Sequence, residues 1–389
     1  MNQSADIVVI GGGVIGCACA YFLARAGMDA VLIEKHGIAS GTSSHCEGNV
    51  LVQDKMPGYD SQLARLSQEL FPGVVADLDR EVGWRRPGTL LVAESEAELA
   101  VAEDFCRQMA QADVPVRFLD ASALHRAEPN LAADLVGGLE FPTDGCLNPM
   151  LFCVALAEAV QRMGARVMAH TEVLAIETDS AGAISAVVTE NGRISTRAVV
   201  NAAGVWSPAI GAMVGLSIPV RPRQGQILVS ERTAPIATRS VVEFGYLMAK
   251  FGNSGYRRAI TPEMERYNIA FVYEPTDAGN FLIGSSRLFT GMNTHCDIPV
   301  LRALAARALR FFPVMRSVSI IRSYAGLRPY TPDHFPIVSA SSVPGFFVAT
   351  GHEGDGIGLS MITGKLMTQI VKGIEPDIDT TPLRLDRFD

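Results

Sequence analysis

Three glycines and one glutamate near the N-terminus have the types and the spacing to bind a dinucleotide. The apolar run Asp6–Ile10 leads into Gly11-Gly-Gly13-Val-Ile-Gly16, and Glu34 follows the next apolar run, Ala30–Ile33. Gly11 allows a sharp turn, Gly13 lets the backbone approach a pyrophosphate, and Gly16 lets a helix pack closely on a sheet. An acidic residue at the Glu34 position accepts hydrogen bonds from ribose hydroxyls, which favours FAD or NAD over NADP. The alternative is an ordinary βαβ unit with a glycine-rich turn.

Two other loops have residues suited to the same cofactor. The segment Gly37–Asn49 is rich in Ser, Thr and Gly, which indicates backbone and hydroxyl contacts to phosphate or flavin, with a plain surface loop as the alternative. Near the C-terminus, the apolar run Phe346–Thr350 enters Gly351-His-Glu-Gly-Asp-Gly-Ile-Gly358. A helix predicted over 357–371 would point its N-terminus at the cofactor and stabilise negative charge on a reduced flavin ring.

The elements that must position these loops have the patterns of an α/β protein. Helices are predicted over Val14–Ala26 with Gly27 as its stop, over 95–112 with a Ser95/Glu98 capping box, and from Asn148 to Met163. Ala198–Ser207 is predicted to be a central parallel strand with a ligand close to its end.

The region 218–285 is predicted to be rich in strands, with a turn at Thr276–Gly279. The helix predicted over Leu301–Phe312 carries arginines that we expect on a solvated face rather than in a binding patch: Arg302, Arg307 and Arg310.

Length and composition limit the classes of function. A chain of 389 residues favours two domains, and 48% hydrophobic residues suit an enzyme with a buried parallel sheet. The net charge of −8 argues against a nucleic-acid partner. No run approaches the ~18 apolar residues of a membrane helix, and no signal peptide is expected. Seven scattered cysteines without metal-ligand spacing predict a cytoplasmic protein with no metal site.

Several catalytic motifs are missing. The chain has neither a second GxGxxG nor a CxxxxC pair, which weighs against a pyridine-nucleotide disulfide reductase. It also lacks the GxSxG and P-loop patterns.

Taken in chain order, the motifs resemble the D-amino acid oxidase superfamily of flavoproteins. The resemblance is strongest to the group of glycine oxidase, the sarcosine oxidase beta subunit, and the beta subunits of D-hydroxyproline and opine dehydrogenases. It covers nearly the whole chain and rests on these segments: Val9–Gly16, Glu34-Lys35, Ala39–Ser43, Val200–Ser207, Arg223–Gln226, Ile283–Arg287, Tyr324–Asp333 and Gly351–Gly358.

The resemblance implies an α/β fold with a Rossmann-type FAD-binding domain (GR2-like) and an α+β substrate domain built on an antiparallel sheet. The FAD domain would comprise residues 1–80, 146–215 and 325–389, and the substrate domain residues 81–145 and 216–324. FAD would be held non-covalently, because Gly326 stands where monomeric sarcosine oxidases carry the cysteine that bonds the flavin.

The resemblance also implies site residues. Arg328 matches the position that clamps a substrate carboxylate, for which a bidentate guanidinium is suited; the alternative is a structural salt bridge. Tyr246 or Tyr273 would cover the substrate, and His352 would touch the flavin ring. The residues expected at the cofactor are Gly11, Gly13, Val14, Ile15, Gly16, Glu34, Lys35, Ser40, Thr42, Ser43, Gly48, Asn49, Val173, Ala202, Ala203, Gly204, Trp206, Arg328, Gly351, His352, Gly354, Asp355, Gly356, Ile357 and Gly358.

Two departures from the family pattern bear on the substrate. Gly354 replaces an arginine of glycine oxidase, which removes one anchor for a small substrate. The segment Val242–Ala270 is longer than usual and could be a lid or a docking surface for another subunit. It carries Tyr246, Tyr256 and Tyr267 with Arg257 and Arg258 between them. Asp355 would either attract a substrate amine or cap the last helix.

The expected activity is FAD-dependent oxidation of the C–N bond of a small amino or imino acid, with hydride leaving Cα for the flavin. D-Hydroxyproline, proline, opines and sarcosine are the candidate substrates. We expect a catalytic beta subunit of a dehydrogenase complex whose alpha or gamma subunits carry a second flavin or an iron–sulfur centre. The alternatives are a stand-alone oxidase that makes hydrogen peroxide and a flavin-bearing electron-transfer subunit.

Overall fold

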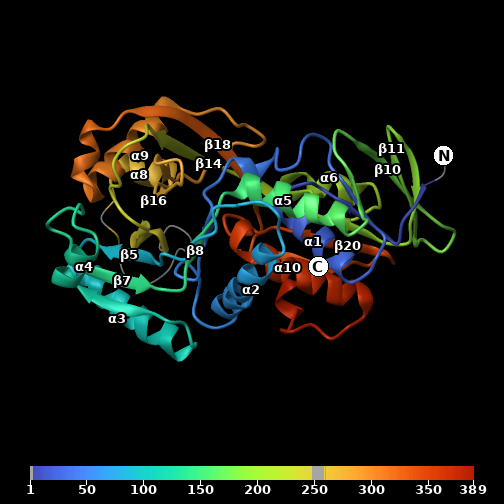
Figure 1. Cartoon of the computed structure of the whole chain (residues 1–389), viewed down its shortest axis with the longest axis horizontal. Helices are drawn as coiled ribbons and strands as arrows, with labels where there is room; N and C mark the ends of the chain where they lie inside the picture. The colour runs from blue at the N-terminus through green and yellow to red at the C-terminus, as the bar shows by residue number, and fades with distance from the viewer. Residues whose placement is uncertain (1–2, 248–257, 259) are drawn as a thin grey trace.

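The computed structural model describes residues 3–247, 258 and 260–389. Two large sheets form the two halves of the molecule in Figure 1, with β14 and β18 labelled near the middle of the view. The first sheet has six strands in the order β19 (Ile337–Ala340), β20 (Phe346–Thr350), β13 (Val199–Asn201), β2 (Ile7–Ile10), β3 (Ala30–Ile33) and β9 (Arg166–Met168).

The six-stranded sheet is parallel except where β19 pairs with β20. Every residue of β2, β3 and β13 is buried, as expected for parallel strands covered on both faces. β13 lies between β2 and β20, so the prediction of a central parallel strand after Ala198 is confirmed.

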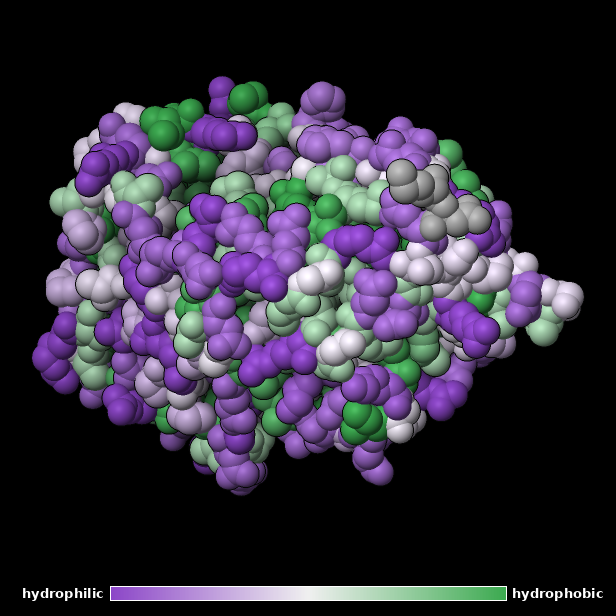
Figure 2. All heavy atoms as spheres, turned by 45° about the vertical axis from the view of Figure 1, so that its right-hand side comes forward, coloured by the Kyte–Doolittle hydropathy of each residue, from purple (hydrophilic) through white to green (hydrophobic). Residues whose placement is uncertain are grey.

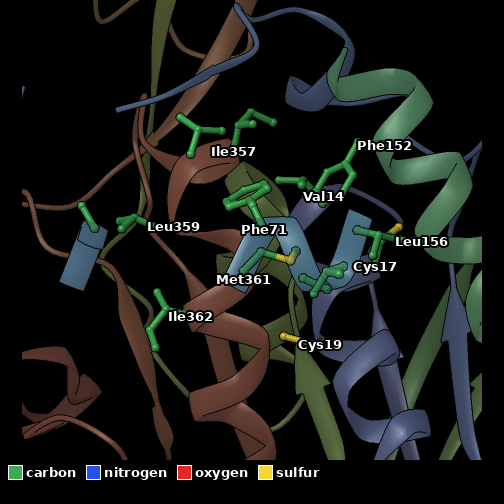
Figure 3. Packing of buried hydrophobic residues seen from close by; sticks show 14 of the residues in the cluster. Val14, Cys17, Cys19, Phe71, Phe152, Leu156, Ile357, Leu359, Met361 and Ile362 are labelled. Carbon is green, nitrogen blue, oxygen red and sulfur yellow. The ribbon is translucent and has the colours of Figure 1, made fainter. Parts of the chain in front are cut away.

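Helices from distant parts of the chain cover one face of this sheet. They are α1 (Val14–Arg25), α2 (Tyr59–Ala76), α5 (Pro149–Arg162) and α10 (Gly356–Lys372). Figure 3 shows side chains of these helices interdigitating, Val14 and Cys17 with Phe152 and Met361. α1 and α10 cross closely because Gly364 has no side chain: a Cβ there would lie 2.6 Å from the backbone oxygen of Ala18. Cys17 and Cys19 are fully buried packing residues.

The second large sheet has eight strands. Their order is β18 (Ile320–Tyr330), β14 (Arg221–Ser230), β17 (Phe281–Gly284), β16 (Val272–Pro275), β15 (Ser240–Glu243), β5 (Thr89–Ala93), β7 (Gly137–Phe141) and β6 (Arg117–Asp120). All neighbours are antiparallel except β15 and β5. The predicted turn at Thr276–Gly279 is confirmed, since Thr276 exchanges backbone hydrogen bonds with Gly279 and Asn280.

The remaining elements are smaller. A four-stranded sheet has the order β1 (Gln3–Ser4), β12 (Gly192–Ser195), β11 (Ile184–Thr189) and β10 (Val173–Thr178), and β4 (Asn49–Val50) pairs with β8 (Gly145–Cys146). The other helices are α3 (Glu96–Gln111), α4 (Ala121–Ala127), α6 (Ser207–Ala212), α8 (Pro262–Tyr267) and α9 (Ile298–Phe311).

The caps predicted for two helices agree with the structure, whereas α9 begins at Ile298, three residues before the predicted Leu301. Asn148 caps α5 by accepting the N–H groups of Met150 and Leu151, and Ser95 caps α3 by accepting the N–H of Glu98. The Glu98 carboxylate in turn accepts the N–H of Glu94 at 2.6 Å.

The prediction of a solvated arginine face on α9 is wrong for Arg307. Its side chain is buried and forms ion pairs with Glu94, which follows β5, and with Glu243 at the end of β15. Arg302 is exposed, as predicted.

Polar and charged residues cover most of the face in Figure 2, with apolar residues in small separate groups. Within the described residues, no helix combines the length and the apolar character needed to cross a membrane. Nor do their His, Cys, Asp and Glu side chains form any group of three or more that could hold a metal ion.

Candidate active site

A cavity of about 700 Å³ lies at the carboxyl ends of the parallel strands, next to Ile10, Ile33 and Ala202. This edge of an α/β sheet is the usual place for a ligand, because the loops that leave neighbouring strands diverge there. Residues of the three predicted cofactor segments share its wall.

The glycine turn after β2 has no space for side chains at two positions. Gly11 has φ +115°, and a Cβ there would lie 2.5 Å from the backbone oxygen of Ala202. A Cβ at Gly16 would lie 1.8 Å from the oxygen of Gly11, so only glycine allows α1 to start this close to the turn. Gly13, the N-cap residue of α1, has no side chain, and Gly13, Val14 and Ile15 line the cavity, so the N-terminus of α1 faces it with its positive dipole end.

Glu34 lies at the end of β3 on the same wall. Its carboxylate accepts the N–H groups of Gly12 and His36, both at 2.7 Å. These two bonds fix the carboxylate at the cavity edge. Lys35 also lines the cavity and pairs with Glu172 at 2.7 Å, with both side chains about half exposed.

The polar loop 37–49 is a wall of the cavity rather than a plain surface loop. Ser40, Thr42 and Ser43 all line the cavity. Ser43 accepts the N–H of Val14 at 3.0 Å, and Thr42 donates to the carbonyl of Leu327 at 2.6 Å. The loop therefore joins the start of α1 to β18.

His352 forms part of the wall contributed by the C-terminal loop. The ring is buried, and its Nε2 lies 2.9 Å from the Thr363 hydroxyl. Burial lowers the pKa of His352 to about 3, so the imidazole is neutral at physiological pH. Its Nδ1 has no hydrogen-bond partner among the residues that the structure describes.

Arg328 lies where the large cavity meets a second, smaller chamber of about 50 Å³, and it lines both. Its guanidinium lies over Gly225, where a Cβ would be 2.1 Å from Nη1, and it donates to the carbonyl of Ser286 at 2.9 Å. Within the described part of the chain, no carboxylate forms an ion pair with Arg328, which disfavours the structural salt bridge. A half-buried guanidinium held in this way can bind a ligand carboxylate.

The small chamber has charged walls. Tyr246 lines it, as does Lys55, whose Nζ lies 2.6 Å from Asp54 and 2.9 Å from Asp355. Asp355 stands at the N-cap position of α10 but makes no capping hydrogen bond, so its carboxylate serves the ion pair instead. Glu47 lines both the chamber and the large cavity.

Tyr273 does not reach the chamber. Its side chain is 1% exposed and packs against Phe281 and Phe312 in a separate apolar core, with its hydroxyl near the backbone of Ala237. The preceding residue, Val272, does line the chamber. Because neighbouring residues of a strand point to opposite faces, Tyr273 has to point away from it.

Gly48 also lies away from the cofactor cavity that it was predicted to line. It lines neither cavity; its N–H donates to the buried carboxylate of Glu274, and a Cβ would lie 1.7 Å from the oxygen of Leu147. Burial raises the pKa of Glu274 to about 8.

The other predicted cofactor residues divide into three groups. Gly16 and Gly351 support the wall without lining a cavity. Asn49, Asp355 and Gly358 line the small chamber. The large cavity is lined by Gly11, Gly13, Val14, Ile15, Glu34, Lys35, Ser40, Thr42, Ser43, Val173, Ala202, Ala203, Gly204, Trp206, Arg328, His352, Gly354, Gly356 and Ile357.

The segment Val242–Ala270 is only partly described. Tyr256 and Arg257 lie outside the described residues. Tyr267 is half-buried on α8, and Arg258 pairs with Glu243 at 2.9 Å, so neither lines a cavity.

The sequence predicted no role for Lys55 or Asp54. Lys55 and Asp54 belong to no motif, and the only available signal was their proximity to the polar loop. Gly326, at the position of the flavin-bonding cysteine of monomeric sarcosine oxidases, lines the large cavity. It has no thiol, and a Cβ there would lie 2.2 Å from the backbone oxygen of His45. A flavin–cysteine bond at this position is therefore impossible in this chain.

Comparison with known proteins decides the family. The FAD dependent oxidoreductase (DAO) family model matches residues 6–370. The chain belongs to this family. It is similar to hydrogen cyanide synthase subunit HcnC of Pseudomonas aeruginosa, with 28% identity over 100% of this chain and 97% of the relative. It is 29% identical to one subunit of the opine oxidase of Rhizobium meliloti, over 90% of this chain and 89% of the relative.

The fold agrees with a solved relative. The crystal structure of glycine oxidase from Geobacillus kaustophilus matches with a TM-score of 0.86 and 27% identity, covering 99% of each chain. The expected α/β fold with an FAD-binding Rossmann-type part is thus confirmed, and the protein is an FAD-dependent oxidoreductase.

The residues present fit FAD. The cavity volume of about 700 Å³ is in the usual range for a ligand. The turn has no room for a Cβ at Gly11 or Gly16, the start of α1 lines the cavity, and Glu34 is fixed at the end of β3.

Proposed function

We propose that this protein oxidises the C–N bond of a small amino or imino acid. The observation that carries the proposal is Arg328, a half-buried guanidinium that lines both the large cavity and the small chamber and pairs with no carboxylate among the described residues. A cation in this position is suited to an anionic ligand, and a carboxylate matches its fork of donors.

Each wall of the large cavity would have its own role in binding FAD. Glu34 would hold the ribose hydroxyls of FAD, and the N-terminus of α1 its pyrophosphate. The N-terminus of α10 would stabilise negative charge on the ring. When bound, FAD supplies the acceptor for the two electrons that leave the substrate.

The chain's own residues orient the substrate and exclude water. Arg328 would hold the carboxylate and so fix Cα, while Tyr246 would cover the chamber. Neutral His352 would contact the ring without adding charge. No general base is required if the amine binds neutral.

We also propose the domain division 1–80, 146–215 and 325–389 against 81–145 and 216–324. It is supported by the six-stranded sheet lying in the first set and most of the eight-stranded sheet in the second. β18 (Ile320–Tyr330) crosses the boundary, which puts Arg328 at the junction of the two sets.

For the cellular role, we propose a catalytic beta subunit of a cytoplasmic dehydrogenase complex. Two relatives are named as subunits, and all seven cysteines are free thiols. Partner subunits with a second flavin or an iron–sulfur centre would take up the electrons. The second candidate is a stand-alone oxidase, favoured by the similarity to glycine oxidase.

An anaerobic absorbance titration of the holoenzyme tests the proposal. Amino acids, N-methyl amino acids, cyclic imino acids and opines are added in turn, and bleaching of the flavin band by one class is expected. Slow recovery of the band on admitting air supports a dehydrogenase, and rapid recovery an oxidase. No bleaching by any compound, with FAD bound, would reject the proposal in favour of an electron-transfer subunit.

A further inference from the structure

Two more arginines lie beside Arg328. Arg223 is directly opposite Arg328 in the antiparallel pair of β14 and β18. Arg287 follows Ser286, whose carbonyl accepts from the Arg328 guanidinium at 2.9 Å. Three guanidinium groups from three chain segments thus lie close enough to interact electrostatically, and of these Arg328 lines the small chamber.

The carboxylates around this cluster do not balance its charge. Glu353 pairs with Arg223 at 2.5 Å and also lies 3.0 Å from Nδ1 of His334. Glu47 lines the chamber but forms no ion pair with any of the three arginines within the described residues. One ion pair therefore leaves two guanidinium groups without a carboxylate.

Arg287 is the least satisfied of the three. The residue is 5% exposed, and both Nη1 and Nη2 are buried without a hydrogen-bond partner among the described residues. A buried charge without a partner is costly, and such a residue is a sign of a ligand that supplies the missing charge. Arg223, at 6% exposed, has its Nε unpartnered as well.

The two neighbouring arginines affect the pKa of Arg223. Burial is the main reason that its pKa is lowered to about 10; Glu353 opposes the shift, and the neighbouring Arg287 and Arg328 add to it. The three groups therefore share one poorly solvated region.

Tyr246 connects Arg287 with the chamber. The phenol lines the chamber, and the Arg287 guanidinium carbon lies 4.3 Å from the centroid of its ring. Tyr246 thus contacts both. Arg287 itself lines neither cavity, so a ligand in the chamber reaches it only if the Tyr246 side chain changes rotamer.

We propose that the substrate carries a second carboxylate, which binds Arg287 beside the carboxylate held by Arg328. The substrate class is then a dicarboxylic amino acid or an N-(carboxyalkyl) amino acid, in preference to glycine, sarcosine or proline. This inference rests on the proposed function, since it places the first carboxylate on Arg328. Arg223, already paired with Glu353, adds positive potential.

The test measures binding without turnover. The oxidised holoenzyme is titrated with succinate and with butyrate, which differ by one carboxylate, and dissociation constants are read from the flavin difference spectrum. Succinate is expected to bind about ten- to one-hundredfold more tightly, the effect of one charge-assisted contact. Arg287→Met should abolish this advantage and leave butyrate binding unchanged, and Arg287→Lys should retain part of it. Arg302→Met, at an exposed position on α9, is the control.

Equal binding of succinate and butyrate by the unmodified protein overturns the inference, and so does an advantage that persists in Arg287→Met. The first comparison decides even if the variants fail to fold. Anaerobic bleaching by sarcosine and by N-(carboxymethyl)glycine separates the two proposals. Bleaching by sarcosine with no preference for succinate keeps the proposed function and rejects the second carboxylate site. A succinate advantage without bleaching by any amine keeps the site and rejects the proposed function.

Discussion

The two ends of the active site are formed by different chemical groups. At the nucleotide end the surface is backbone: Gly11 and Gly16 leave no room for side chains, and α1 offers its N-terminus. At the chamber end the surface consists of charged side chains: Arg328, Lys55 and Glu47 come from separate segments of the chain. A backbone cradle recognises what all FAD molecules share, whereas a set of side chains can differ from one substrate to another. Substrate specificity is therefore expected to depend on the side chains at the chamber end.

The largest effect is expected at Arg328. Arg328→Met should lower kcat/KM about a thousandfold, because a desolvated carboxylate would lose its charged partner. Arg328→Lys should recover only part of it, since an ammonium lacks the bidentate fork. Steady-state kinetics with the bleaching substrate, together with flavin content, measure both variants. Loss of turnover with FAD retained supports the division between the two ends; unchanged turnover would show that the substrate site lies on a partner.

The next effect concerns the nucleotide end. Gly11→Ala should weaken FAD binding about a hundredfold, because φ +115° is strained for alanine and the new Cβ would lie 2.5 Å from the Ala202 oxygen. Reconstitution of the apoprotein followed by flavin fluorescence gives the dissociation constant. Gly37→Ala is the matched control, since nothing lies within 4 Å of a Cβ there. Equal affinities of the two variants would contradict a cradle made by backbone.

A smaller effect is expected from pH at His352. Its pKa falls from 6.5 in the unfolded chain to about 3 on burial, so the neutral ring is favoured in the folded protein. The stabilisation is present above pH 6.5 and is lost as the pH falls toward 3.

Between pH 7 and pH 5 the wild type should lose about 2 kcal/mol of unfolding free energy relative to His352→Asn, which does not titrate. Urea unfolding at several pH values measures the difference. If the difference in unfolding free energy between the two proteins does not change with pH, the imidazole is not buried in the neutral form. The nucleotide end would then carry a charged side chain.

Features of the sequence that depend on local backbone were predicted well. The strands at 7–10 and 30–33, the caps of α3 and α5 and the glycine turn each depend on residues close together in the chain. Arg328 was predicted through its family motif, and the structure adds that it lacks a carboxylate partner among the described residues.

The failures have tertiary causes. Tyr273 was a candidate by its residue type, but Val272 faces the chamber and the alternation of β16 sends Tyr273 into the other core. Arg307 has the helical position of a surface residue, yet Glu94 and Glu243 arrive from two other strands to pair with it.

The cofactor end of this protein could be predicted from its sequence, because a glycine at a positive φ and an acidic strand end act through their own backbone and immediate neighbours. The chamber could not, because its residues come together only in the folded chain. Lys55 pairs there with Asp355, 300 positions away in the sequence numbering, and Arg287 borders the chamber only through its contact with Tyr246. Charges act through space, so the balance of a cluster is fixed only when the fold brings its members together.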